Sequence, residues 1–419
     1  MASIEEIRGA RLAKLKLLQD KGINPYPVSS HPTHTLKEAV EKFNELETLG
    51  KPATLVGRIL SIRAQGKIVF FTFDDGTGKF QALLKHEEPT PKEDFELFTN
   101  AFDIGDFVEV TGKLFLTKKE EKTILGEGVR MLGKTLRPLP EKWHGLGDVE
   151  ERFRKRYLDL ISNEGVKERF IIRSKIVSEM RRILDDAGYV EVETPALQPI
   201  YGGATAEPFI THHKALDTDL YLRISDELYL KRLLAGGMPK VYEIARDFRN
   251  EGIDSTHNPE FTMLEFYEAY SDALKQRAFV EEMIRTLAEK VLGKMSLEWD
   301  GEEIHFGKAF DALPYYSLFE KFLGIDDVAN LDDADLRDKA EKLEVKVEEG
   351  DSRYKVMDNI YKKAIRPKLV EPTFIIDYPE NYLPLAKKIE GKDGIVDAFQ
   401  LVIGGVELVK AFSELNDPL

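Results

Sequence analysis

The sequence contains no cysteine, which excludes a disulfide scaffold, a thiolate metal site and a cysteine nucleophile. It also lacks a run of about 18 apolar residues that could cross a membrane. Its N-terminus lacks the charged-then-apolar pattern of a secretory leader. We therefore expect a soluble, cytoplasmic protein with no membrane partner.

Length and charge limit the remaining possibilities. A chain of 419 residues exceeds the size at which one hydrophobic core stops growing, so two or three domains are expected. The net charge of −15 argues against a polyanionic partner for the chain as a whole. Residues 1–137 are nearly neutral, however, so the acidic excess lies in residues 138–419. The N-terminal third is therefore the part that could meet nucleic acid.

The N-terminal third predicts a helix followed by a small barrel. Residues 3–21 carry apolar side chains at helical spacing, within an N-terminal helical arm of residues 1–50. Short runs rich in β-branched and aromatic residues then predict five strands. Five short strands favour a closed OB-fold β-barrel over residues 51–137. A proline-containing linker over residues 138–155 follows.

Residues 156–419 predict an irregular mixture of helices and strands. We expect helices at 166–187 and 227–235 and a helical insertion at about 273–366. Strands at 241–248 and 260–270 flank a polar loop. The predicted fold class is therefore α+β and multidomain, with the barrel followed by a domain built on an antiparallel sheet.

One nucleotide-binding motif can be rejected from its context. Residues 128–135, GVRMLGKT, match the phosphate-loop pattern G-x-x-x-x-G-K-[ST]. Such a loop leads into a helix whose N-terminus faces the phosphates, but Pro138 and Pro140 follow and prevent that helix. Residues 129–132 fit better as the last barrel strand.

The hairpin predicted over residues 241–270 concentrates charge on one face. Because side chains alternate along a strand, that face carries the following residues: Glu243, Asp247, Arg249, Glu251, Phe261, Met263, Glu265 and Tyr267. The other face is ordinary core, with Tyr242, Ile244, Phe248, Leu264 and Phe266. The charged face is either a solvated surface with ion pairs or the lining of a polar pocket. Its aromatic side chains favour the pocket.

These residues resemble a known family. FRNEG at 248–252, followed by His257 and Phe261, resembles the second signature of class II aminoacyl-tRNA synthetases. GYVEVETP at 188–195 resembles the first signature, which forms the dimer interface of that family, so Gly188 and Pro195 are expected there. Residues 201–234, 384–388 and 412–419 resemble the lysyl-tRNA synthetases. The resemblance implies a homodimer that attaches L-lysine to tRNA(Lys) with ATP through a lysyl-adenylate.

The resemblance also implies roles for individual residues. The ATP-binding residues would be Arg249, Glu251, His257, Phe261 and Glu407. The lysine-binding residues would be Gly203, Glu227, Arg249, Glu265, Tyr267 and Glu414. The catalytic residue would be Arg249, since its guanidinium fork matches the oxygens of the carboxylate and the α-phosphate. Magnesium would bind Glu407 and Glu414, and anticodon bases would contact Arg63, Phe70 and Gln81.

Several of these assignments have plainer explanations. Glu227 lies near a helix start, where the helix dipole favours glutamate in any case. Phe70 taken alone fits packing inside the barrel equally well. Glu407 and Glu414 are seven residues apart, which places them on opposite faces of a regular strand, so a turn or bulge between them is required.

Two features depart from the family pattern. Lys410 stands where relatives usually have asparagine beside the substrate. The sequence ends at Leu419, without the family's third signature and its second ATP-binding arginine, so we expect these 419 residues to activate lysine poorly.

Two other functions remain as alternatives to a lysyl-tRNA synthetase. One is an aspartyl- or asparaginyl-tRNA synthetase, against which the acid-rich pocket argues. The other is a catalytically inactive tRNA-binding relative.

Overall fold

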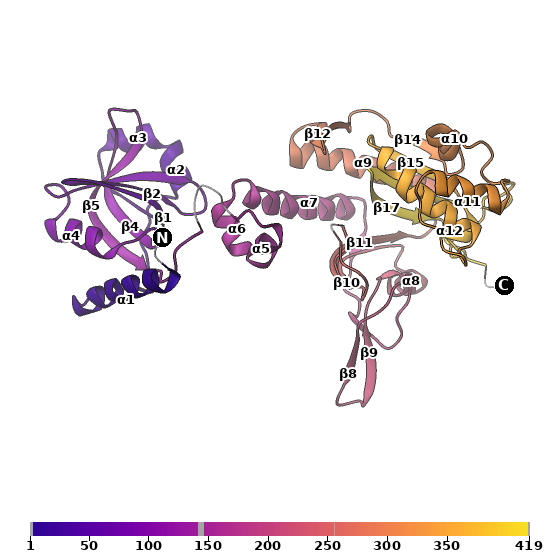
Figure 1. Ribbon diagram of the computed structural model, residues 1–419, viewed down its shortest axis with the longest axis horizontal. Coiled ribbons are helices and arrows are strands. Elements are labelled where there is room, and N and C mark those ends of the chain that lie inside the picture. The colour runs from indigo at the N-terminus through magenta and orange to yellow at the C-terminus, as the bar shows by residue number, and fades with distance from the viewer. Residues whose placement is uncertain (1–2, 141–145, 255, 418–419) are drawn as a thin grey trace. The chain divides into compact units, whose positions relative to one another are not determined.

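The computed structural model describes residues 3–140, 146–254 and 256–417 (Figure 1). Residues 141–145 of the predicted linker and the last two residues of the FSELNDPL motif lie outside the described residues. The chain divides into two compact units, Met1–Lys167 and Glu168–Leu419, and each has its own core. Among the described residues, no helix combines the length and apolarity needed to span a bilayer.

The first unit is built around a closed barrel with strand order β1-β2-β3-β5-β4. Its strands are β1 (Ala53–Gln65), β2 (Ile68–Asp74), β3 (Lys79–Lys85), β4 (Phe107–Leu116) and β5 (Lys122–Gly133). Its helices are α1 (Ile4–Asp20), α2 (Leu36–Glu41), α3 (Phe43–Leu49), α4 (Lys92–Ala101), α5 (Val149–Arg154) and α6 (Arg156–Ser162). The predicted OB-fold is confirmed, and α5 lies within the stretch that we expected to be a linker.

Alternate side chains of the strands fill the interior of the barrel. Along β2 the side chains of Val69, Phe71 and Phe73 are buried, while the residues between them are half-buried on the outer face. The Phe71 ring stacks on Phe98 of α4, with 4.7 Å between the ring centroids. The phosphate-loop motif lies mostly on β5, paired with β4, so its rejection is confirmed.

The second unit combines several small sheets with helices. Its helices are α7 (Val166–Asp186), α8 (Glu227–Ala235), α9 (Ala273–Leu287), α10 (Ser317–Leu323), α11 (Asp333–Lys342), α12 (Arg353–Ile360), η1 (Ala288–Leu292), η2 (Tyr361–Ile365), η3 (Arg366–Lys368) and η4 (Glu380–Tyr382). Its strands are β6 (Val190–Glu191), β7 (Leu197–Gln198), β8 (Ile210–His213), β9 (Thr218–Leu222), β10 (Lys240–Phe248), β11 (Glu260–Glu268), β12 (Ser296–Trp299), β13 (Glu302–His305), β14 (Asp311–Pro314), β15 (Thr373–Pro379), β16 (Ile395–Ile403) and β17 (Val406–Phe412).

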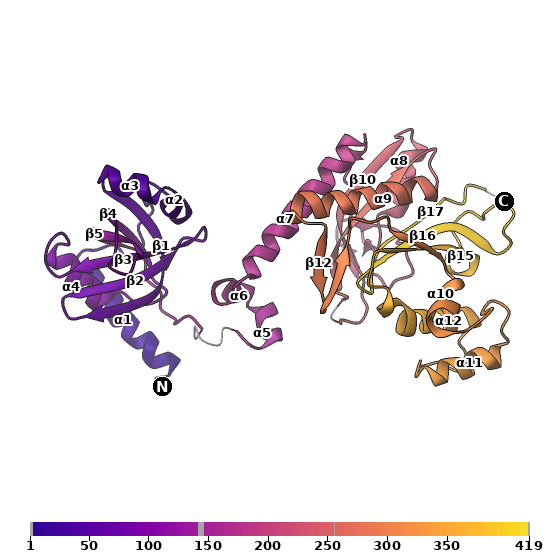
Figure 2. The same cartoon turned by 90° about the horizontal axis from the view of Figure 1, so that it is seen from above.

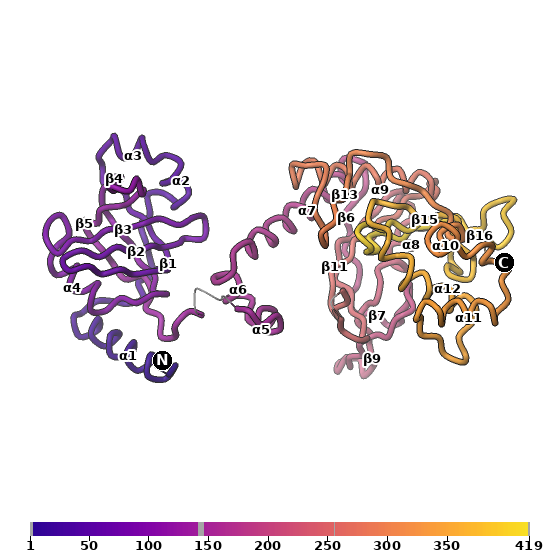
Figure 3. Tube along the Cα trace, turned by 45° about the horizontal axis from the view of Figure 1, so that its top comes forward, coloured from indigo at the N-terminus to yellow at the C-terminus, as the bar shows by residue number. Residues whose placement is uncertain are grey.

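A sheet of order β14-β15-β16-β17 separates two apolar cores. Phe399 and Leu401 of β16 pack with α9 on one face, and Ala398 and Val402 pack with α10–α12 on the other. Figure 2 shows α9 and the α10–α12 group on opposite sides of this sheet. Figure 3 traces the chain through α10, α11 and α12, which lie between β14 and β15 in the sequence. The segment expected to be a helical insertion thus also contains the β12–β13 hairpin and β14.

The predicted hairpin of β10 and β11 is antiparallel, with Glu243 opposite Glu265 and Asp247 opposite Phe261. Its apolar face packs Tyr242 with Leu184 of α7 and Met283 of α9. The alternation predicted for the two strands is therefore confirmed. The charged face lies beside the N-terminal end of α8, and the β8–β9 hairpin projects from this part of the unit (Figure 1).

Candidate active site

Two acids on the charged face of the β10–β11 hairpin are buried, while the other side chains of this face are half-buried or, for Glu251, exposed. Glu243 is 4% exposed and Asp247 is fully buried, so this face is not a solvated surface with ion pairs. Buried carboxylates require compensating partners, because an isolated ionised group is very costly to remove from water. The solvated-surface interpretation therefore does not hold for Glu243 and Asp247, and the polar pocket stays a prediction.

Arg223, immediately after β9, is the cation that compensates these acids. Its side chain forms ion pairs with Glu243 at 2.7 Å, Asp226 at 3.1 Å and Asp247 at 3.5 Å. Glu243 also accepts hydrogen bonds from the amide and hydroxyl of Thr194. The guanidinium fork therefore fixes the segment before β7, the start of α8 and strand β10 to one another.

Three carboxylates remain crowded beside this arginine. Oxygens of Asp226, Asp247 and Glu265 lie within 4.8 Å of one another. Burial and mutual repulsion raise the pKa of Asp226 and of Asp247, and burial raises the pKa of Glu265. These carboxyl groups therefore hold protons to higher pH than usual, and a nearby cation would favour their ionised forms.

Glu265 and Tyr267 of β11 line the pocket together. Glu265 accepts hydrogen bonds from the hydroxyls of Ser225 and Tyr267, each at 2.9 Å. Burial and the nearby carboxylates, Glu265 first, raise the pKa of Tyr267 above its ordinary value. Gly203 lies against the same turn, with a positive φ of 87°, and an added Cβ would come within 3.0 Å of Ser225 and Glu227. A glycine is therefore required there for the loop to approach α8 closely.

Glu227 is the first residue of α8, and its amide donates to the Ser225 hydroxyl. The N-cap residue of α8 is Asp226, whose side chain makes no cap hydrogen bond. Lys231, one turn further along α8, forms ion pairs with Glu227 and, at 2.8 Å, with Glu414. These two acids are thereby brought to the same side of the pocket.

Arg249 follows β10 at the rim of the pocket. Its guanidinium donates to the carbonyl of Ile224 and lies 5.1 Å from the centroid of the Phe261 ring. A cation held over an aromatic face is partly desolvated and keeps its direction. The structure therefore brings Arg249 and Phe261 together, as the hairpin pattern predicted.

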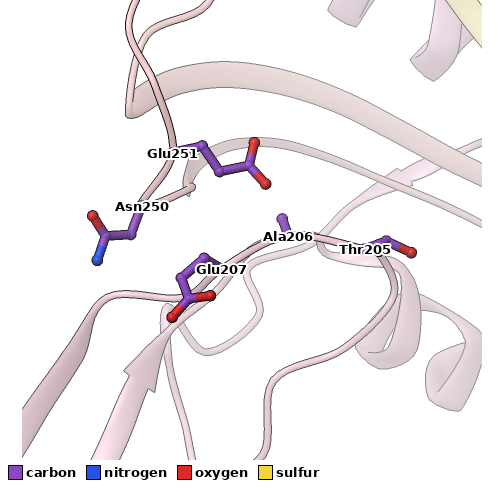
Figure 4. Close-up of a pocket in the computed structure, with 5 residues that line it drawn as sticks. All are labelled: Thr205, Ala206, Glu207, Asn250 and Glu251. Atoms are coloured by element: carbon purple, nitrogen blue, oxygen red, sulfur yellow. The ribbon is translucent and has the colours of Figure 1, made fainter. Parts of the chain in front are cut away.

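Glu251 lines an open pocket formed with Thr205, Ala206, Glu207 and Asn250. Figure 4 shows its carboxylate extending over the loop that carries Ala206 and Thr205, with the Asn250 side chain pointing away from it. The Asn250 amide donates to the Glu207 carbonyl at 2.8 Å and closes this loop.

His257 lies in the exposed loop between β10 and β11. Its Nδ1 is 2.9 Å from Asp254 Oδ2. Hydrogen bonds from Thr256 and His257 hold the pKa of Asp254 well below its usual value. No contact among the described residues joins His257 to the buried carboxylates.

A β-bulge lies between Glu407 and Glu414, as their spacing of seven residues required. The β16–β17 register shifts between the Val402–Glu407 and Leu401–Val409 pairs, which is a bulge, and Glu414 lies two residues after the end of β17. Glu407 accepts from the amide of the buried Gln400, whose oxygen in turn accepts from two tyrosine hydroxyls. Lys410 is exposed on β17.

The three candidate anticodon residues share the outer face of the barrel. Arg63 pairs with Phe70 across β1 and β2, and Thr72, two residues from Phe70, pairs with Gln81. Phe70 is half-buried and is not part of the barrel core, which argues against the packing explanation. The Gln81 amide donates to Thr123 at 2.8 Å.

The candidate dimer residues lie at the end of α7 and beyond β6. Gly188 has a positive φ of 82° and ends α7. Pro195 is exposed, and so are several apolar side chains of this region: Phe170, Ile171, Val190, Leu197 and Ile200.

Four residues of this site were not identified from the sequence: Arg223, Asp226, Lys231 and Gln400. Lys231 could have been found, because it lies four residues after Glu227 on a predicted helix. The other three depend on contacts between distant segments.

The sequence was compared with known proteins. Residues 148–419 match the family described as tRNA synthetases class II (D, K and N), and residues 53–132 match the OB-fold nucleic acid binding domain. A lysine–tRNA ligase of Carboxydothermus hydrogenoformans is 46% identical over 99% of this chain and 84% of its own length. Those of Pelotomaculum thermopropionicum and Roseiflexus sp. are 45% and 44% identical over 99% of this chain and 82% and 85% of their own lengths. The chain therefore belongs to the lysine–tRNA ligase family of class II tRNA synthetases.

Proposed function

We propose that this chain attaches L-lysine to tRNA(Lys) with ATP, through a lysyl-adenylate. The observation that carries this proposal is the acid-rich pocket: Glu227, Glu265 and Glu414 gather where α8, β11 and the end of β17 meet, with Arg249 at the rim. Lysine carries two ammonium groups and one carboxylate, and such a pocket offers acceptors for the first two and a cation for the third.

Each part of the substrate has a proposed partner. Gly203 and Glu227 would receive the α-amino group, and Glu265, Tyr267 and Glu414 would receive the ε-ammonium. Arg249 would hold the substrate carboxylate against the α-phosphate of ATP. The carboxylate is itself the nucleophile, so no general base is needed, and catalysis consists of positioning and charge stabilisation.

ATP would lie along the hairpin rim. Phe261 would stack on adenine, Glu251 would accept from the adenine amino group, and His257 would approach the terminal phosphates. Glu407 would join this set through a divalent metal. ATP with a divalent metal is what the family uses, and we propose that the metal is Mg²⁺.

Glu407 and Glu414 fit such an ion. Both carboxylates are exposed, and each presents hard oxygen ligands, the type that Mg²⁺ prefers. The metal would neutralise phosphate charge when bound. The chain's own contribution is to orient Glu407 through Gln400.

The barrel would read the anticodon of tRNA(Lys). Phe70 would stack on a base while Arg63 and Gln81 contact base edges, which is how unpaired RNA bases are recognised. We further propose a cytoplasmic homodimer formed through the first-signature segment that contains Gly188 and Pro195.

The test is amino-acid-dependent pyrophosphate exchange with a panel that contains lysine, aspartate and asparagine. We expect lysine alone to drive exchange, because the side chain of aspartate would bring a fourth carboxylate toward Glu227, Glu265 and Glu414. Exchange driven by aspartate or asparagine would contradict the assignment.

A further inference from the structure

Lys231 of α8 places an ammonium group of the protein itself in the lysine pocket. Its Nζ forms ion pairs with Glu227 and with Glu414, and it lies 5.6 Å from the centroid of the Phe412 ring. Its side chain is 22% exposed, so these contacts are partly shielded from water. Such pairs are stronger than those on an open surface.

The two acids that hold Lys231 are acids that the proposed function assigns to the substrate. The end of a lysine side chain is chemically the same group as the ε-ammonium of free lysine. In the ligand-free chain, therefore, one internal ammonium already satisfies two carboxylates of the pocket. The third acid, Glu265, accepts from neutral donors, namely the hydroxyls of Ser225 and Tyr267 and the backbone amide of Asp226.

The two contacts of Lys231 differ in strength. Glu227 is 11% exposed and lies one helical turn from Lys231 on α8, so this pair is held by the helix itself. Glu414 is 43% exposed and lies two residues after the end of β17, so its pair with Lys231 is more open to water. An incoming ammonium would displace Lys231 from Glu414 more easily than from Glu227.

We propose that Lys231 is an internal competitor of the substrate, which occupies Glu227 and Glu414 in the free enzyme and must release Glu414 when lysine binds. This inference rests on the proposed function, because it requires Glu414 to receive the ε-ammonium of lysine. Lys231 then weakens lysine binding, since part of the binding energy is used to break an existing ion pair. The alternative explanation is that Lys231 only orients the two glutamates. In that case, replacing Lys231 by an uncharged residue would raise the Kd for lysine.

The experiment measures lysine affinity in Lys231→Met and Lys231→Arg variants of the full chain. Calorimetric titration with L-lysine, without ATP or added divalent metal, gives Kd with no competing ion at Glu414. We expect Lys231→Met to lower Kd by about three- to tenfold, the range for loss of a partly shielded ion pair. Lys231→Arg keeps the cation and should stay close to wild type. The KM for lysine in pyrophosphate exchange should fall in parallel with Kd.

A matched control is Lys342→Met. Lys342 pairs with Asp338 one turn away on α11, at 2.6 Å, so this change removes the same kind of helical ion pair outside the pocket. Its lysine Kd should equal that of the wild type. If Lys231→Met does not fold, Lys231→Gln keeps a polar side chain without charge and should lower Kd in the same way.

An unchanged or higher Kd in a folded Lys231→Met or Lys231→Gln variant would overturn the proposal. Failure of the proposed function would look different: the wild-type chain would then bind no lysine, and another amino acid would drive exchange.

Discussion

Arg249 is the residue on which the proposed chemistry depends most. Arg249→Ala removes the guanidinium that lies over Phe261 and leaves the apolar face of the hairpin untouched. We expect lysine-dependent pyrophosphate exchange to fall by about 10²- to 10³-fold, the loss typical of one preorganised charge contact. Arg246→Ala serves as the control, because Arg246 is exposed on β10, three residues before Arg249, and pairs with Glu260. Near-normal exchange in Arg249→Ala would refute the assignment.

The buried aspartates predict an unusual dependence of stability on pH. A raised pKa means that folded Asp226 binds its proton more tightly than the unfolded chain does. Stability is therefore lost as the pH rises above the ordinary carboxyl pKa of about 4 and through the raised pKa. Asp226→Asn should make the free energy of unfolding less dependent on pH, with its largest gain at the alkaline end. Denaturant titrations at pH 5 and pH 8 measure this, and an equal slope in both proteins would contradict it.

Glu268 on β11 should show the opposite sign. Burial opposes its ionisation, but hydrogen bonds from Lys275, Gln276 and Tyr189 lower its pKa to about 2. Its contribution to stability is present above the ordinary carboxyl pKa and is lost as the pH falls toward 2. Glu268→Gln should therefore lower the free energy of unfolding at pH 7 and have little effect at pH 2. A variant equally destabilised at both values would show that packing, not charge, explains the effect.

Helices and strands could be predicted from the sequence where residues close together in the chain determine them. The hairpin of β10 and β11 followed from alternation over residues 241–270, because a strand's period of two fixes which side chains share a face. Helix α8 followed from its apolar spacing and the glycines after it. Burial of the charged face could not be derived, since it depends on Arg223 arriving from a different segment. Gln400 and Lys231 likewise acquire their roles only through contacts with β17 and the residues after it.

Strand β2 offers a test that separates binding from packing. Phe70 lies on the outer face and Phe71 in the core, so the two adjacent residues are natural controls for each other. Phe70→Ala should raise the KM for tRNA in aminoacylation and leave stability nearly unchanged. Phe71→Ala should destabilise the barrel by about 3–5 kcal/mol, the usual cost of removing a buried phenylalanine.

The measurements are aminoacylation kinetics and thermal unfolding of both variants. Lysine-dependent pyrophosphate exchange without tRNA should be unaffected by Phe70→Ala, because the candidate active site lies in the other unit. Loss of stability in Phe70→Ala equal to that in Phe71→Ala would instead support a packing role.

At the scale of the whole molecule, charge is divided between the two units. The acidic excess lies in the second unit's part of the sequence, where a pocket for a diammonium substrate requires it, while the barrel is left nearly neutral. The net charge of −15 is therefore compatible with a tRNA partner, because steering depends on the local field rather than on the sum.

The apolar surface around the first signature predicts how two chains associate. Val190 of β6 is 51% exposed and lies in the first-signature segment through which we propose that the dimer forms. If the proposed dimer forms through this segment, Val190→Asp should convert it to a monomer in sedimentation experiments, since a charge within an apolar interface would be removed from water without a partner. Leu216→Asp, at an exposed position between β8 and β9, introduces the same charge and should leave the dimer intact. A Val190→Asp variant that sediments as the wild type does would contradict this prediction. An unpaired aspartate could not be tolerated inside an interface, so the dimer would then have to form through another surface.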